Sequence, residues 1–586
     1  MFQTRSRTPI VVGLIATFAP LGLLLSNTDW FLTREGYLDP WNYVGLFQQY
    51  LDPDYLPEDY KLARLPWILA GALVANVGAP VTAAYVLHGA FLSATSCALF
   101  VGLYALLQRP ALAGVVSLSF GFYTHAHGSG GWDYHNTGAG AFFLATFALV
   151  ALPAAIEGRR AALVAAGAMA ALTVHTNVTL VNFLPALIFV HMQVVKLRTA
   201  SRLSPGLVQR LGWGLLGGLL VTSLLGLVNW WVGRDFLFFG RLLSIVLRFV
   251  SDTSNLEMFH QPWSSGWLLT ARYLALPGAV FLAGAIFVVA NRVSRTPSDR
   301  IAGALVTQHV VMVLVWIAWQ TAGQTALDWD YFAYVLIPGC FIAIGGLLSR
   351  GWPEWCERHW LITMVGSIVL IGGFLVVESI PAARLIAAAT ASNIFVWGSL
   401  GLLLPFLVYR WRPSLISAAL VVVIFAVGNR LVAPGYPDYF STDPCKVQPA
   451  VYGAIVDAAS WLMTEADPLY TRARIWFDEE EIVQPLENCR VRLGHVANSI
   501  ATMASMSYVA RAFPLAGLDA LPDGAVTALT SDRILVIISN SPAPLDAWTR
   551  RIAAMGLTHA ETQSHRVQML ASGFTIHAWS IHSAAQ

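Results

Sequence analysis

Long apolar runs dominate this chain of 586 residues and limit what it can fold into. Only 12% of the residues are charged and 56% are hydrophobic, whereas a soluble globular protein carries about 25% charged residues. Several runs reach the roughly 20 residues that a helix needs to cross a bilayer. The sequence therefore predicts an α-helical polytopic membrane protein. The net charge of +2 gives no indication of a nucleic-acid partner.

Polar breaks divide the apolar sequence into about 13 predicted transmembrane helices. The first follows Arg5 and Arg7 as in a signal peptide, but no small-residue cleavage site comes after it, so we expect it to be retained. An additional apolar piece, 66–79, is expected to be short or re-entrant. The predicted spans are 9–26, 81–107, 110–124, 138–156, 160–176, 178–195, 211–232, 267–290, 301–321, 331–348, 361–377, 386–408 and 414–429.

The basic residues of the short loops predict the orientation. With the N-terminus inside, every short basic loop falls on the cytoplasmic side, as the positive-inside rule requires. The long segments 27–65 and 233–266 and the chain after 430 then lie outside, in a multi-pass protein of the inner (plasma) membrane. The basic loop residues are Arg109, Arg159, Arg160, Lys196, Arg198, Arg202, Arg210, Arg292, Arg295, Arg300, Arg350, Arg358, Arg410 and Arg412.

The composition changes near residue 430 to that of a soluble domain, so we predict a membrane domain over 1–429 and a small extracytoplasmic α/β domain over 430–586. Within the second, 533–540 and 574–581 have the pattern of strands and 545–555 that of an amphipathic helix.

Two of the five cysteines, Cys445 and Cys489, belong to this second domain. An oxidising compartment would permit them to pair, and two free thiols are the alternative. Cys97, Cys340 and Cys356 fall in or beside predicted spans and lack the spacing of metal ligands.

The first outside loop carries a carboxylate next to a predicted helix start. Asp39 is a good N-cap, and Pro40 favours the first turn of a helix that would run from Trp41 to Tyr50. This helix would lie at the membrane interface, with Trp41 and Tyr43 among its aromatic anchors. A carboxylate held there suits a general base that deprotonates an acceptor hydroxyl. The alternative is that Asp39 only caps the helix.

Arg64 ends the same loop, where charged residues meet the next apolar run. A guanidinium at this place would hold a phosphate with two parallel hydrogen bonds. The alternative is an ordinary interfacial arginine at a helix end.

The second outside loop is short and rich in polar side chains. It contains His125, His127, Asp133 and His135 in a glycine-rich stretch between two predicted spans. Polar groups at such depth are expensive unless they line a cavity, so they mark a candidate site. They could hold a metal, although their spacing matches no standard zinc pattern. Alternatively, Asp133 or His135 binds substrate, or the histidines are hydrogen-bonded structural residues.

The loop 233–266 places positive charge outside, against the general trend of the chain. Arg241 and Arg248 are seven residues apart and share a face if the segment is helical. Together with Arg272 they supply positive charge that suits an anionic lipid phosphate, and the same loop carries His260. Charge balancing with the acidic residues of the loop is the alternative.

These segments together resemble the C-type (GT-C) superfamily of glycosyltransferases. The residues that carry the resemblance are Leu38 to Tyr43 (LDPWNY), Tyr60 to Pro66 (YKLARLP), Gly131 to Tyr134 (GWDY) and Tyr331 to Pro338. The chain resembles the protein mannosyltransferase and lipid A aminoarabinose transferase branch more than the oligosaccharyltransferase branch, whose Trp-Trp-Asp signature is missing from the terminal domain.

One departure concerns the proposed base. That branch commonly places two acidic residues side by side in the first loop, whereas here Asp39 is followed by Pro40, which leaves Asp29 as the reserve. The resemblance implies no cofactor firmly. A divalent metal is needed in the oligosaccharyltransferase branch and not necessarily in the aminoarabinose-type branch.

The resemblance implies an inverting transferase that moves a sugar from a polyprenyl-phosphate donor to a lipid, glycan or protein acceptor outside the cytoplasm. Asp39 would be the general base, and the expected substrate-binding residues are Trp41, Tyr43, Arg64, Asp133, Tyr134, His135, Arg241, Arg248 and His260. A transporter or flippase of lipid-linked sugars is the alternative. It predicts inverted repeats and charges inside the spans, and neither is evident in the sequence.

Overall fold

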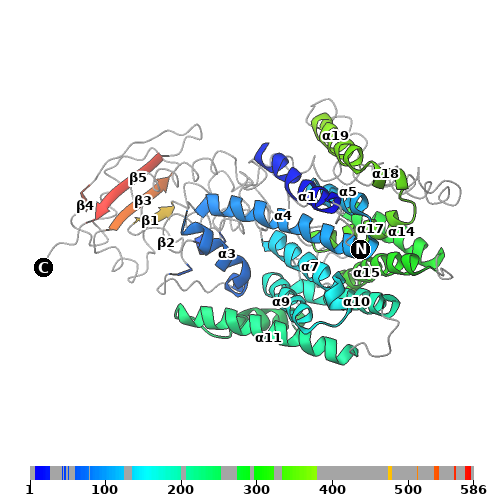
Figure 1. Cartoon of the computed structure of the whole chain (residues 1–586). Helices are drawn as coiled ribbons and strands as arrows, with labels where there is room; N and C mark the ends of the chain where they lie inside the picture. Colours follow the sequence, from blue (N-terminus) through cyan, green and yellow to red (C-terminus); the bar gives the residue numbers. More distant parts are fainter. Residues whose placement is uncertain are drawn as a thin grey trace. The chain divides into compact units, whose positions relative to one another are not determined.

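The structure is a computed structural model, and the described residues are mostly helical (Figure 1). They divide between two compact units, one formed by 1–31, 53–70 and 85–436 and the other by 32–52, 71–84 and 437–586. The described residues are 7–26, 43, 45–47, 50–51, 60–77, 80–123, 135–198, 206–251, 274–290, 296–322, 333–378, 473–477, 511–512, 533–539, 560–561 and 575–581.

Apolar helices make up most of this described part. Four stretches are long and apolar enough to cross a membrane, namely Ala83–Leu107, Val178–Arg198, Leu207–Trp231 and Pro297–Thr321, and shorter apolar helices accompany them. The helices are α1 Thr8–Ser26, η2 Tyr60–Ala63, α3 Leu65–Ala75, α4 Pro80–Leu107, α5 Pro110–Gly121, α7 His135–Ala151, α8 Pro153–Ile156, α9 Arg160–Thr176, η3 Val178–Phe183, α10 Leu184–Arg198, α11 Leu207–Trp231, α12 Gly240–Ser251, α14 Ala275–Ala290, α15 Pro297–Thr321, α17 Ile337–Ser349, α18 Glu354–Arg358 and α19 Trp360–Glu378.

The predicted spans up to residue 378 each correspond to helix in the structure, and the apolar piece 66–79 is the short helix α3. The predicted spans 386–408 and 414–429 lie outside the described residues, so the count of 13 stays a prediction. A multi-pass helical architecture agrees with the composition that predicted it.

Arg210 corrects one predicted boundary. The sequence placed this charge in a loop before a span at 211–232, but α11 already begins at Leu207 and the side chain of Arg210 is only 3% exposed. Its guanidinium donates to the carbonyl oxygens of Ala155 at 2.6 Å and Ile156 at 2.9 Å. A charge is tolerated inside the helix because these carbonyls satisfy it.

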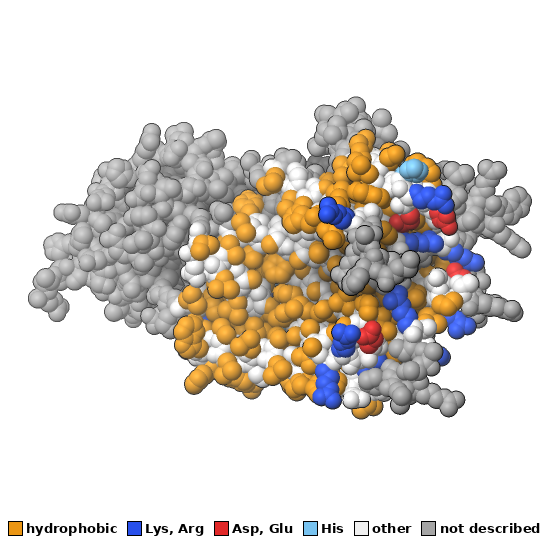
Figure 2. Space-filling view, viewed as in Figure 1, with side chains coloured by type: hydrophobic (Ala, Val, Ile, Leu, Met, Phe, Trp, Pro, Cys, Tyr) orange, Lys and Arg blue, Asp and Glu red, His pale blue; other side chains and the backbone are white. Residues whose placement is uncertain are grey.

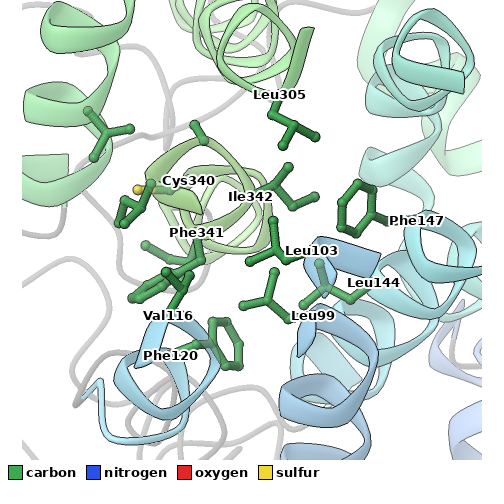
Figure 3. Close-up of a cluster of buried hydrophobic side chains, with 14 of the residues drawn as sticks. Leu99, Leu103, Val116, Phe120, Leu144, Phe147, Leu305, Cys340, Phe341 and Ile342 are labelled. Atoms are coloured by element: carbon green, nitrogen blue, oxygen red, sulfur yellow. The ribbon is translucent and has the colours of Figure 1, made fainter. Parts of the chain in front are cut away.

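The core of the helical unit forms where α17 packs between neighbouring helices (Figure 3). The ring of Phe341 lies edge-on to Phe120 of α5, with centroids 5.2 Å apart. Gly345, one turn further along α17, lies so close to Leu103 of α4 that a Cβ added to it would be 2.7 Å from that side chain. The small residue lets the two helices approach, as in membrane bundles generally.

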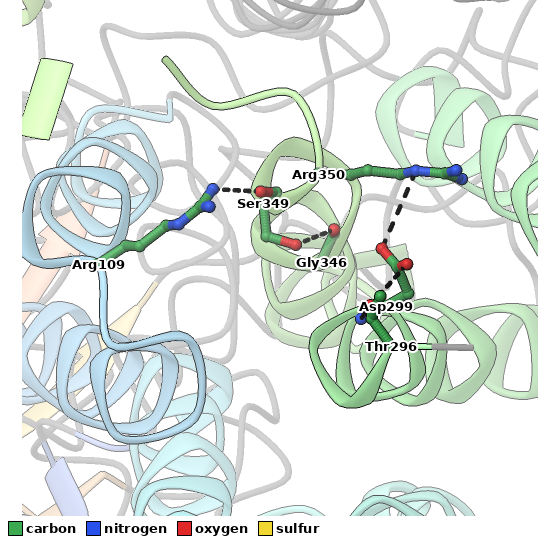
Figure 4. Close-up of polar contacts among 6 residues, drawn as sticks. All are labelled: Arg109, Thr296, Asp299, Gly346, Ser349 and Arg350. Carbon is green, nitrogen blue, oxygen red and sulfur yellow. Dashed lines mark hydrogen bonds and ion pairs between the residues drawn. The ribbon is translucent and has the colours of Figure 1, made fainter. Parts of the chain in front are cut away.

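Arginines at one end of this unit hydrogen-bond to the carboxyl ends of other helices. Arg109, in the link between α4 and α5, donates to the carbonyl oxygen of Ser349 at the end of α17 (Figure 4). Arg198 donates to Ala105 at 3.0 Å and Leu106 at 2.9 Å, near the end of α4. Helix carboxyl ends carry partial negative charge and unsatisfied carbonyls, so each contact is favourable on both counts.

The same end holds further charged residues. Arg350 lies 3.9 Å from Asp299, which in turn accepts a hydrogen bond from Thr296 at 2.7 Å (Figure 4). In the space-filling view, the basic side chains gather toward one end of the face and hydrophobic side chains cover most of the rest (Figure 2). The described residues Arg109, Arg198, Asp299 and Arg350 therefore lie at one end of the helical unit.

Glu357 is expected to stabilise this end by capping α5. Pro110 has no N–H, and the next two backbone N–H groups, of Ala111 and Leu112, donate to the Glu357 carboxylate at 2.9 and 3.0 Å. We expect Glu357→Ala to lower the free energy of unfolding by about 1 kcal/mol, measured by thermal unfolding in detergent. Glu357→Gln keeps an acceptor but not the charge, so its loss should be smaller; an equal loss would show that the acceptor contributes nothing.

The second unit contains a five-stranded sheet in the order β2-β1-β3-β5-β4. Strands β1 Ala473–Phe477, β2 Arg511–Ala512 and β3 Arg533–Ser539 are parallel, and β5 Thr575–Ile581 and β4 Ala560–Glu561 are antiparallel to their neighbours. The two predicted strands are confirmed as β3 and β5. The predicted helix 545–555 and both cysteines of this domain lie outside the described residues.

Candidate active site

Arg64 occupies the junction between η2 and α3, where the backbone fixes its position. Its carbonyl oxygen accepts hydrogen bonds from the N–H groups of Trp67 and Ile68 in the first turn of α3, both at 3.1 Å. Its own N–H donates to Lys61 at 2.9 Å. Pro66 lies in the first turn of α3, where a missing N–H costs nothing. Arg64 therefore directly precedes the start of a helix, where the sequence predicted the next apolar run to begin. Its side chain projects from a defined turn.

The guanidinium of Arg64 contacts His135, the first residue of α7. Arg64 Nη1 lies 3.0 Å from His135 Nδ1, across 71 residues of sequence. An arginine can only donate, so Nδ1 accepts and the imidazole is the neutral tautomer with its proton on Nε2. The His135 side chain is buried, at 2% exposure. Two residues predicted separately from two loops are thus brought into contact.

The next two residues of α7 reach other elements. Asn136 accepts a hydrogen bond at 2.8 Å from Asn177, which caps η3 by accepting from the backbone of Thr179. Thr137 Oγ1 lies 3.4 Å from Nδ1 of His88, on α4. Successive side chains on a helix point about 100° apart, so the first turn of α7 contacts three different neighbours.

An apolar layer lies one turn further along both helices. The ring of Trp67 on α3 packs against Gly138 on α7, where an added Cβ would be 2.9 Å from Trp67 Cε3. On the other side Trp67 packs with Phe91, with centroids 5.3 Å apart, and Phe91 meets Phe142 edge-on at 5.5 Å. The close Trp67–Gly138 contact sets the separation of α3 and α7 at the level of Arg64.

The described charged residues around Arg64 are basic. Lys61 is only 5% exposed and lies one turn before Arg64. The amino ends of α3 and α7 meet here, and each carries a partial positive charge. The amphipathic helix α12 packs against η2 and carries Arg241, whose side chain is exposed. Such an arrangement can hold an anion, and a phosphate ester is the anion that arginine and lysine hold best.

The site lies at the opposite end of α4 from the arginine-bound carbonyls. His88 and Ala105 are 17 residues apart on this helix, which corresponds to about 26 Å. That distance approaches the roughly 30 Å thickness of a bilayer core. Arg64 and His135 therefore lie at the end of the helical unit opposite the arginine-bound carbonyls.

Most other predicted site residues lie outside the described part of the chain. Arg241 and Arg248 share α12 as expected, although only the Arg241 side chain is described. Tyr43 is helical and fully buried. The predicted residues outside the described ones are Asp39, Trp41, Asp133, Tyr134 and His260.

The tyrosines of the first outside loop correct one expectation. Tyr43 and Tyr50 were predicted to anchor an interfacial helix, but both are 0% exposed and therefore pack inside the protein. Phe47, between them, lies against Gly71 of α3, where an added Cβ would be 2.0 Å from the ring. Tyr43, Phe47 and Tyr50 therefore pack against protein, and not against lipid as their spacing suggested.

Some polar residues of the site were not anticipated. His88 lies inside an apolar predicted span, and an ionisable residue at such a place is itself an indication of function. Asn177 lies at the boundary of two predicted spans, as caps commonly do. Neither position reveals its partner in the sequence, because the contacting residues are 49 and 41 positions away.

The metal alternative for the second loop is untested. Among the described residues no group of three His, Cys, Asp or Glu side chains could hold a metal ion. His125, His127 and Asp133 lie outside them. His135 is described, and its Nδ1 is occupied by Arg64.

Comparisons with known proteins return solved structures alone. No family model matches the chain, and no curated protein matches it. ArnT from Cupriavidus metallidurans bound to undecaprenyl phosphate is similar at 14% identity, with a TM-score of 0.44 and 97% of each chain covered. An oligosaccharyltransferase from Archaeoglobus fulgidus in the apo form is similar at 11% identity, with a TM-score of 0.41, covering 91% of this chain and 70% of that one.

Proposed function

We propose that the chain is an integral membrane glycosyltransferase that transfers a sugar from a polyprenyl-phosphate donor to an extracytoplasmic acceptor. The observation that carries this proposal is the Arg64–His135 pair, with Lys61 beside it, at the amino ends of two apolar helices. A lipid-linked phosphate would reach this level with its chain in the bilayer. Its negative charge would meet the guanidinium and the helix ends.

The proposed reaction is a single inverting displacement. The acceptor hydroxyl oxygen attacks the anomeric carbon, the bond from that carbon to the phosphate oxygen breaks, and the polyprenyl phosphate leaves with the bonding electrons. Asp39 takes the hydroxyl proton, and Arg64 holds the phosphate as its charge increases. Charge that develops on a leaving group is where fixed donors contribute most to catalysis.

The finer assignments are part of the same proposal. Arg241 and Arg248 on α12 would add to the phosphate site, and Trp41, Tyr43, Asp133, Tyr134 and His260 would contact the donor or acceptor. His135 would take part in substrate binding beside Arg64. Residues 430–586 would form the extracytoplasmic domain, with the membrane domain before them in the inner (plasma) membrane. The acceptor class and any divalent metal are left open by these residues.

Asp39→Asn is expected to lower the turnover number by about 100- to 10,000-fold, the usual contribution of a general base. Purified protein would be assayed against a panel of polyprenyl-phosphate sugars, with release of free polyprenyl phosphate as the measurement. Binding of undecaprenyl phosphate should be unchanged, because asparagine keeps the shape of the side chain.

Asp29→Asn is the matched control, since Asp29 is the other aspartate at the start of the same loop. It should keep normal turnover. Near-normal turnover of Asp39→Asn would remove Asp39 from the mechanism. A wild-type protein that moves the donor across proteoliposomes without releasing polyprenyl phosphate would show a transporter instead.

A further inference from the structure

We propose that His135 is a positioning residue that orients the Arg64 guanidinium toward the donor phosphate. This inference rests on the proposed function and adds a residue to it. It starts from the 3.0 Å contact between Arg64 Nη1 and His135 Nδ1, in which the histidine accepts. The imidazole therefore acts on the donor through Arg64.

The geometry of arginine explains how the His135 contact acts on the whole guanidinium. The guanidinium is planar and its five N–H groups form a rigid fork, so fixing one N–H fixes the directions of the others. A phosphate held by two parallel N–H groups requires this plane to be correctly turned. A long side chain without such a contact would sample many rotamers, and ordering it on binding would weaken affinity.

His135 is suited to the task because it is itself held. It is 2% exposed and opens α7, whose next residue, Asn136, bonds to Asn177. The packing of Trp67 on Gly138 then fixes α3 relative to α7. Both partners of the Arg64–His135 contact are thus attached to backbones whose separation is set by packing one turn away.

The neutral state of the imidazole also matters. A second cation at this position would repel Arg64, whereas an imidazole with a lone pair on Nδ1 attracts it without neutralising its charge. A carboxylate would form a stronger pair but would compete with the phosphate for the guanidinium. A neutral acceptor such as His135 therefore orients the arginine without itself neutralising the positive charge.

The alternative is that the contact only ties α3 to α7. The two roles differ in what side-chain replacements do. An asparagine places its amide oxygen near the position of Nδ1, whereas a glutamine places its oxygen near Nε2 and a leucine offers no acceptor. If the contact only ties the helices together, its loss lowers the unfolding temperature. If it positions Arg64, its loss lowers the affinity for phosphate, and this effect requires Arg64.

The experiment measures binding of undecaprenyl phosphate to the purified full-length protein in detergent, together with its thermal unfolding. The variants are His135→Leu, His135→Gln, His135→Asn, Arg64→Ala and the double variant Arg64→Ala with His135→Leu. Thr137→Val is the matched control, because it removes the neighbouring contact of α7 with His88 and leaves Arg64 untouched.

We expect His135→Leu and His135→Gln to raise the dissociation constant about tenfold, which corresponds to about 1.4 kcal/mol. His135→Asn and Thr137→Val should stay within about threefold of the wild type. In the Arg64→Ala background, His135→Leu should have no additional effect, since coupled residues are not additive.

Three outcomes would overturn the inference. Wild-type affinity in His135→Leu would show that the contact does not orient Arg64. Equal losses in all three His135 variants and Thr137→Val would indicate a tether. Additive losses in the double variant would place His135 in a separate role. Absence of binding to the wild type would instead reject the proposed function, and the contact would then be structural.

Discussion

Arg64→Ala is expected to lower kcat/KM for the lipid-linked donor at least about 100-fold, because it removes the charge-assisted hydrogen bonds that hold the leaving phosphate. The loss should appear in both kcat and KM, since the phosphate is held in the ground state and gains charge in the transition state. Initial rates across donor concentrations would separate the two parameters.

Arg64→Lys separates the effect of the planar guanidinium donors from the effect of the positive charge. Lysine keeps one positive charge but offers neither the planar pair of donors nor an Nη1 to meet His135. We expect it to recover less than about one tenth of the lost activity. Arg300→Ala is the charge-matched control, because this exposed arginine lies at the basic end of the helical unit. Wild-type rates in Arg64→Ala would exclude Arg64 from phosphate binding.

Gly217→Ala is expected to cause the largest loss of stability among single-methyl changes in α11. The backbones of α9 and α11 approach so closely that a Cβ on Gly217 would be 1.9 Å from the carbonyl oxygen of Val164. A backbone atom cannot turn aside as a side chain can, so the helices must separate. We expect a loss of about 1–3 kcal/mol, measured as a lower unfolding temperature in detergent.

Gly214→Ala provides the comparison within the same helix. A Cβ at Gly214 meets nothing within 4 Å. Alanine is a better helix former than glycine by about 1 kcal/mol, so this change should be neutral or stabilising. If both variants unfold at the same temperature, the α9–α11 contact is not as close as the structure shows.

The helices could be predicted from the sequence because apolar length alone determines where a chain crosses a bilayer. The runs that became α4 and α15 are long and mostly apolar, and the apolar run in β3 and the alternation in β5 are equally local. The same rule predicted wrongly that Arg210 lies in a loop, because it starts a span after the last charged residue. The burial of Arg210 depends on carbonyls of Ala155 and Ile156, which are more than fifty residues away in the chain.

The site could be predicted only in part. Arg64 and His135 stand out because charged and polar groups are costly beside apolar runs. That they contact each other follows from the packing of α3 on α7, which depends on Trp67 and on the absence of a side chain at Gly138. No local pattern contains this information, since it belongs to two helices about seventy residues apart.

The arginine contacts at the basic end have a consequence for how the chain is made. The carbonyls at the end of α4 receive Arg198 only after 92 further residues have been synthesised, and Arg109 reaches Ser349 across 240 residues. Until then these helix ends must be satisfied by water or lipid headgroups. The basic end of the early helices therefore closes late in biosynthesis, and a chain that stops before α17 leaves the ribosome with the carbonyl oxygen partner of Arg109 still missing.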